Sequence, residues 1–192
     1  MSPRLKPSNL TVAPLSELPP DYDPKKDSIE IVPYDPRWPE LYSREEAALR
    51  RSLPNIPGLR IDHYGSTAVP GLAAKPIIDI LLRVDRSHWS GLIAPIESLG
   101  YFYWATNPDG DTLYFAKGMP PLGTGRTHHI HVFGPERDRE IRFRDHLRAE
   151  PRTARAYEAL KRELAAKFPY DREGYTDAKT EFIEGVLRGE KT

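Results

Sequence analysis

Residues 63–80 read His63-Tyr64-Gly65-Ser66-Thr67-Ala68-Val69-Pro70-Gly71-Leu72-Ala73-Ala74-Lys75-Pro76-Ile77-Ile78-Asp79-Ile80. Runs of apolar side chains predict one strand that ends in this stretch, over residues 59–64, and a second strand over residues 77–84. A Gly-Ser turn and a loop of small residues join them, and the second strand carries a single acidic residue. This order is typical of a site for a metal-bound polyphosphate, because the turn approaches phosphate closely and the carboxylate holds the cation.

Three residues carry that interpretation. Gly65 permits a tight turn and a close approach of the backbone to a ligand. Ser66 adds a hydroxyl and a backbone N–H that reach phosphate oxygens. Asp79, presented from a rigid strand, is the candidate ligand for Mg²⁺ or Mn²⁺. The alternative is an ordinary turn between two strands, with Asp79 capping a neighbouring loop.

The same stretch resembles the signature of the GrpB family, whose fold belongs to the nucleotidyltransferase superfamily. The resemblance covers roughly residues 29–189. Besides the quoted stretch, it includes the motifs VPYDPRWP at 32–39, HHIHV at 128–132, FRDHLR at 143–148 and YTDAK at 175–179. It implies an α+β, nucleotidyltransferase-like fold. Members also occur fused to dephospho-CoA kinase, which implies a CoA-related or adenine-nucleotide ligand.

Composition limits the class of protein. With 192 residues the chain is long enough for one well-filled domain, which we expect over residues 28–192. Six prolines in residues 1–27 predict an extended or poorly ordered tail. Lys plus Arg equals Asp plus Glu at 28 each, so charge does not favour a specific nucleic acid or a membrane as partner. The absence of cysteine excludes disulfides and thiol chemistry, and without a long apolar run we expect a cytoplasmic protein.

Patterning along the chain predicts the remaining elements. Strands come first, and helices make up the last third, which favours an α+β sheet with helices packed on it. The predicted strands cover residues 29–32, 101–104, 113–116 and 129–133, in addition to the two signature strands. The predicted helices cover residues 38–53, 88–99 and 136–149, the run from Pro151 to a break at Pro169, and about 176–187.

Further candidate residues could complete a metal site. Active nucleotidyltransferases of this fold carry two alternating carboxylates on the signature strand, but positions 77 and 81 are apolar. Asp111 is the candidate second carboxylate, with an ordinary turn residue as the alternative. His129 and His131 lie two apart on a predicted strand and so share a face, where they could bind metal or phosphate or act as a general base. The alternative is a pair of hydrogen-bonded, half-buried histidines.

Basic residues near the same motifs are candidate anion contacts. They lie at strand ends, in the glycine-rich loop over residues 118–126 and in the motif at 143–148: Lys75, Lys117, Arg126 and Arg144. Each could equally be a solvated surface charge. Tyr175 and Lys179 lie four residues apart in the predicted last helix, either at the site or tying that helix to the sheet.

Three functions follow as hypotheses. The first is a metal-dependent transfer of a nucleotidyl or phosphoryl group to a small molecule, with Asp79 on the metal and a histidine assisting the acceptor. The second is a non-catalytic module that binds a nucleotide or a CoA-related phosphometabolite. The third is an interaction module that docks a protein partner through its C-terminal helices and tail.

Overall fold

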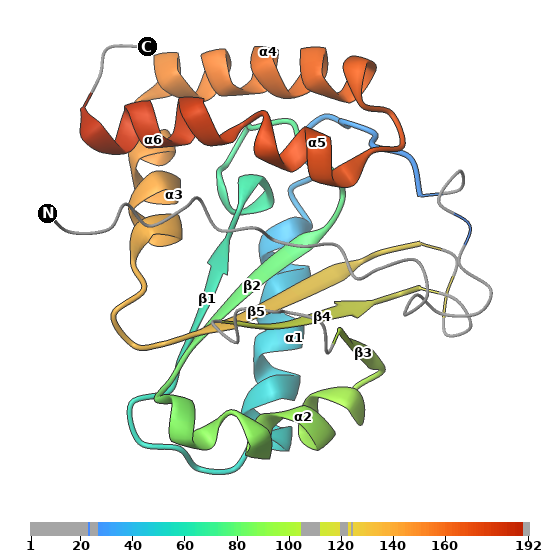
Figure 1. The fold of residues 1–192 in the computed structure, drawn as a ribbon, viewed down its shortest axis with the longest axis vertical. Helices are drawn as coiled ribbons and strands as arrows, with labels where there is room; N and C mark the ends of the chain where they lie inside the picture. The colour runs from blue at the N-terminus through green and yellow to red at the C-terminus, as the bar shows by residue number, and fades with distance from the viewer. Residues whose placement is uncertain (1–22, 24–26, 105–111, 120–122, 124, 190–192) are drawn as a thin grey trace, which may run out of the picture.

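A computed structural model describes residues 23, 27–104, 112–119, 123 and 125–189, which form a five-stranded mixed sheet with helices (Figure 1). The strands, in chain order, are β1 (Arg60–Tyr64), β2 (Ile78–Arg83), β3 (Tyr101–Trp104), β4 (Leu113–Lys117) and β5 (His128–Phe133). Their order across the sheet is β1-β2-β5-β4-β3, with β2 parallel to β5 and the other pairs antiparallel. The predicted α+β class is therefore confirmed.

One face of the sheet is apolar and carries the main core. Alternate residues of a strand point to the same face, so Ile61, Ile80 and Ile130 all project to this side. Helices α1 (Trp38–Ser52) and α2 (Ser90–Glu97) cover it, and their Leu49 and Leu92 side chains are fully buried. Burial of these aliphatic side chains supplies most of the driving force for the N-terminal half of the fold.

The last four helices pack together and over the loop that follows β1 (Figure 1). They are α3 (Arg139–Ala149), α4 (Pro151–Lys167), α5 (Arg172–Asp177) and α6 (Thr180–Arg188). Apolar side chains of α3, α4 and α6 form a second cluster with Val69 and Leu72 from that loop. None of the helices in the described part of the chain is long and apolar enough to cross a membrane.

Three local predictions differ from the structure. Residues 29–32 form no strand, because only Val32 bridges to Ala74 while the Ile29 N–H donates to the Pro169 carbonyl at 2.8 Å. The single predicted last helix is two helices, α5 and α6. Residues 66–68 of the signature loop form a short 3₁₀ helix, η3 (Ser66–Ala68), and a second one, η4 (Arg86–His88), precedes α2.

The predicted tail falls mostly outside the described residues, but its last residue does not. Asp27 is only 9% exposed and is held by two arginines described below. Composition alone placed it in the tail because the contacts that bury it come from residues about 100 and 145 positions away.

Candidate functional site

A cavity of about 290 Å³ lies between the polar face of the sheet and the C-terminal helices. The strands contribute the side chains that alternate with the core residues, so the face opposite the core is the one that lines the cavity. These strand residues are Tyr64, Asp79, Trp104, Tyr114, His129, His131 and Phe133. Gly65, Ser66, Lys75, Arg126 and Arg144 also line it, so the structure brings most of the candidates from the sequence into one site.

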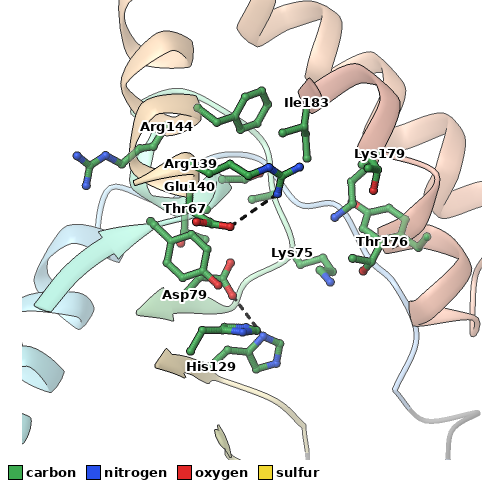
Figure 2. Close-up of a pocket in the computed structure, with 18 of the residues that line it drawn as sticks. Thr67, Lys75, Asp79, His129, Arg139, Glu140, Arg144, Thr176, Lys179 and Ile183 are labelled. Atoms are coloured by element: carbon green, nitrogen blue, oxygen red, sulfur yellow. Dashed lines mark ion pairs between the residues drawn. The ribbon is translucent and has the colours of Figure 1, made fainter. Parts of the chain in front are cut away.

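Asp79 lies at the centre of this face, on β2. Strand pairing places it opposite Tyr64 of β1 on one side and His129 of β5 on the other. The His129 Nδ1 atom is 3.2 Å from Asp79 Oδ1, a contact drawn in Figure 2. Burial lowers the pKa of His129 well below its usual value, and the charges of Arg126 and Lys75 lower it further. His129 is therefore a neutral imidazole in contact with the Asp79 carboxylate.

Burial acts on the carboxylate in the opposite direction. It raises the pKa of Asp79, while the neighbouring Lys75 ammonium is the largest influence that opposes the shift. The second histidine, His131, has its pKa lowered by burial to about 4, so it is also neutral. Asp79 is thus a desolvated acid beside two neutral imidazoles and at least one amine.

The Gly-Ser turn fits tightly against this carboxylate. Gly65 has φ +71°, and a Cβ at this position would overlap Asp79 Oδ2. Only glycine combines that backbone conformation with such a close approach. Thr67 fastens the turn, because its hydroxyl donates to the Ile77 carbonyl at 3.2 Å and also lies 3.1 Å from His63 Nε2.

Three lysines line the same cavity, and one of them was missed from the sequence. Lys161 of α4 is only 2% exposed and donates to the Ala73 carbonyl. Burial lowers its pKa to about 7. Its sequence signal is weak but present, since it lies one turn after Tyr157 on the buried side of a helix whose Glu158–Arg162 pair is exposed. The sequence predicted only the apolar residues of that stripe.

In Figure 2, Lys75 and Lys179 lie to the right of Asp79, whereas His129 lies below it. Both amines flank the Tyr175 ring, at 5.0 Å and 4.3 Å from its centroid. Neither lysine forms an ion pair with a carboxylate among the residues described. Burial lowers the pKa of Lys179 to about 8 and that of Lys75 well below its usual value. Lys179 lies in the break between α5 and α6, as the N-cap residue of α6, and its amine contacts the Tyr175 ring of α5 across that break.

The charge of the cavity lining is strongly asymmetric. Among the described lining residues, eight Lys or Arg stand against four Asp or Glu, an excess of four basic side chains. The basic residues are Lys75, Arg126, Arg137, Arg139, Arg144, Lys161, Arg172 and Lys179, and the acidic ones are Asp79, Glu140, Glu173 and Asp177. The chain as a whole is neutral, so this excess is a local property of the cavity.

One of the predicted residues, Lys117, is not brought into the cavity. Lys117 is the last residue of β4 and lies opposite His128 in the sheet, at a position whose side chain projects to the core face. Its Nζ atom donates to Glu45 Oε1 of α1 at 2.9 Å. Its side chain is therefore a structural ion-pair partner and not an anion contact of this site. Asp111 lies outside the described residues, so the second carboxylate stays a prediction.

The described residues do not form a metal site by themselves. Hard divalent cations take several oxygen ligands, yet no group of three His, Asp or Glu side chains in this part of the chain is close enough to hold an ion. Asp79 contacts His129 and has the amines of Lys75 and Lys179 nearby. These amines would repel a cation bound to the carboxylate. We therefore derive no chemical step through a metal ion.

Comparison with known proteins places the chain in a family. The family model described as GrpB protein matches residues 28–188. A UPF0157 protein of Pseudomonas aeruginosa is 48% identical over 180 residues, covering 90% of this chain and 74% of that protein. A dephospho-CoA kinase of Mycolicibacterium paratuberculosis is 30% identical over 185 residues, covering 83% of this chain and 45% of the kinase.

A solved structure supports the same family. The crystal structure of conserved protein GrpB from Enterococcus faecalis has a TM-score of 0.66 and 31% identity, covering 82% of this chain and 99% of that one. A more distant chain, the Cid1 poly(U) polymerase, has a TM-score of 0.45 and 12% identity over 74% of this chain, too remote to carry an argument. From the family match and these relatives, the chain belongs to the GrpB family.

Proposed function

We propose that this protein binds a phosphorylated small molecule, a nucleotide or a CoA-related metabolite, in the cavity between the sheet and the C-terminal helices. The observation that carries the proposal is the set of desolvated amines of Lys75, Lys161 and Lys179 around one cavity. The amines of Lys75 and Lys179 both lie against the Tyr175 ring, and neither forms an ion pair with a carboxylate of the described residues, although the charge of Asp79 acts on both. Amines held in this way are poorly solvated and gain strongly from an anion that enters the cavity.

The chemical class of the ligand is supported by two further points. The cavity also contains aromatic and aliphatic surface from Tyr157, Phe143 and Ile183, which suits the uncharged part of a metabolite. The similarity to a dephospho-CoA kinase, of which this chain spans 45% of the length, supports a CoA-related or adenine-nucleotide ligand.

Proton linkage tests the role of the amines. At pH 8 Lys161 is largely neutral and Lys179 is partly neutral in the empty cavity, and burial lowers the pKa of Lys75 as well. An anion raises these pKa values, so binding takes up protons. Coordination of a metal by Asp79 and a histidine takes up no protons, because the imidazoles are already neutral and only a protonated Asp79 would have a proton to release. Isothermal titration calorimetry in buffers of different ionisation enthalpy measures the sign directly, with dephospho-CoA and ATP as probes, with and without Mg²⁺ or Mn²⁺.

The variant Lys179→Met and a matched control make this test specific. We expect Lys179→Met to weaken binding by at least tenfold and to reduce the proton uptake. Lys167→Met, on the exposed end of α4, should leave both unchanged. Proton release on binding, or binding that requires the metal, would contradict the amine-based site.

Group transfer is the second candidate function, favoured by the contact between His129 and Asp79. A neutral imidazole beside a carboxylate can accept the proton of an acceptor hydroxyl while the lysines stabilise the transferred phosphoryl group. We expect His129→Asn to lower the rate at which the leaving group forms from ATP at least a hundredfold, with binding changed less than fivefold. That leaving group is pyrophosphate if the nucleotidyl group goes to the acceptor hydroxyl, and ADP if the γ-phosphoryl group does. No formation of either leaving group by the wild type with any acceptor, with or without Mn²⁺, leaves binding alone as the function.

A further inference from the structure

Asp27 is held by two arginines that line the cavity. Its Oδ2 atom accepts a hydrogen bond from Arg126 Nε at 2.8 Å, and its Oδ1 atom accepts one from Arg172 Nη2. The three side chains are each about nine-tenths buried. One carboxylate thus occupies the space between two guanidinium groups.

Both arginines belong to the cavity that holds the lysines. Arg126 and Arg172 line it, and their charges lower the pKa of both Lys75 and His129. Each arginine is also held in place, since Arg126 Nη1 donates to the Tyr114 hydroxyl at 3.1 Å and Arg172 begins α5. The two guanidinium groups therefore converge on one carboxylate.

We propose that the Arg126–Arg172 pair is a second anion subsite, filled in the empty protein by Asp27, which a second phosphoryl group of the ligand displaces. The proposal rests on the proposed function, because the first phosphoryl group is the one held by the lysines. It deepens that function by naming the ligand class, a molecule with at least two linked phosphoryl groups, such as a nucleoside diphosphate or triphosphate.

The exchange has a clear physical basis. Guanidinium groups bind carboxylate and phosphate with the same planar set of donors, so an incoming phosphoryl oxygen can take the place of either Asp27 oxygen. Two buried cations without a counter-charge are costly, and the carboxylate compensates them until a ligand arrives. Asp27 then acts as a competitor within the chain and lowers the apparent affinity for the ligand.

The test uses inorganic pyrophosphate as the probe, measured by calorimetry without metal. Asp27→Asn keeps the shape of the side chain and removes the competing charge, so we expect binding at least tenfold tighter than in the wild type. Adding Arg172→Gln to Asp27→Asn should lose that gain. Glu30→Gln, an exposed acid three residues away, is the matched control and should change affinity less than twofold. Unchanged or weaker binding by a folded Asp27→Asn variant would overturn the proposal.

A measurement on the wild type covers the case in which the variant fails to fold. The Ile29 N–H donates to the Pro169 carbonyl two residues after Asp27. If pyrophosphate displaces Asp27, hydrogen exchange at Ile29 should accelerate at least threefold, whereas slower or unchanged exchange with bound pyrophosphate would refute displacement.

Failure of the inference and failure of the proposed function give different results. If Lys75→Gln abolishes pyrophosphate binding while Asp27→Asn has no effect, the lysine site stands and the second subsite is refuted. If Asp27→Asn tightens binding and Lys75→Gln has no effect in that background, the arginine subsite stands and the lysine-based function is refuted.

Discussion

Replacement of the buried Lys161 by methionine is the most informative single change. Burial lowers the pKa of this lysine from 10.5 to about 7. The difference of about 3.5 units, at about 1.4 kcal/mol per unit, corresponds to a penalty of about 5 kcal/mol below pH 7 and about 4 kcal/mol at pH 7 itself. Methionine removes that penalty, and it fills a similar volume with a flexible apolar chain.

The lost hydrogen bond offsets part of the gain. Lys161 donates to the Ala73 carbonyl, and leaving that oxygen without its donor costs about 1–3 kcal/mol. We therefore expect Lys161→Met to stabilise the protein by about 1–3 kcal/mol at pH 7. In a chain of this length each kcal/mol raises the melting temperature by about 2–4 °C.

The pH dependence gives the sharper readout. Because the pKa of Lys161 is lower in the folded protein, the unfolded chain binds more protons between pH 7 and 10.5, and the stability of the wild type rises with pH through this window. The lowered pKa of Lys179 also makes the stability of the wild type rise with pH. The charged groups that act on Lys161 are Lys179 and Arg162, which lower its pKa, and Glu158, which raises it. The difference between the wild type and Lys161→Met isolates the contribution of Lys161 alone.

Urea unfolding at several pH values from 7 to 9.5 measures both effects. The stability advantage of Lys161→Met should shrink as pH rises, whereas the control Lys167→Met should follow the wild type at every pH. A variant that is less stable than the wild type at pH 7, with an unchanged slope, would show that Lys161 is a fully satisfied structural cation.

Two other substitutions test the geometry of the site and of the sheet. Gly65→Ala should destabilise the protein by at least about 2 kcal/mol in chemical unfolding, because it adds both backbone strain at φ +71° and overlap with Asp79. The control Gly71→Ala has φ +79° and nothing within 4 Å of its Cβ, so it should cost only the backbone strain, about 1–2 kcal/mol. Equal losses would show that the turn does not press on the carboxylate. Arg83→Met leaves a partly buried carboxylate without its 2.7 Å ion pair and should cost about 2 kcal/mol or more, whereas Arg44→Met, in an exposed pair, should change stability by less than about 0.5 kcal/mol. A loss of less than about 0.5 kcal/mol for Arg83→Met would show that this pair adds nothing to the sheet.

Much of the candidate site was predictable because its signals are local. Gly65 and Asp79 are read from a strand, a turn and a second strand that are continuous in sequence. His129 and His131 share a face because strand side chains alternate with a period of two. Lys117 was misjudged on the same local grounds, since its position at a strand end did not reveal which face of the sheet it joins.

The contributions of Lys161 and Asp27 could not be read in the same way. A lysine in a helix and an aspartate after a proline-rich run are usually solvated. Residues distant in sequence bury both side chains. Burial lowers the pKa of the Lys161 amine, and two distant arginines form ion pairs with the Asp27 carboxylate.

The sequence by itself determined the α+β class, the signature strands and the turn, because these depend on local propensity and hydrophobic period. The tertiary structure decided which residues form the site. Parallel pairing of β2 with β5 sets Asp79 beside His129, and the packing of α4, α5 and α6 over the signature loop brings Lys161 and Lys179 into the same cavity. A pKa depends on desolvation and nearby charge, and both are properties of the folded arrangement rather than of any segment of the chain.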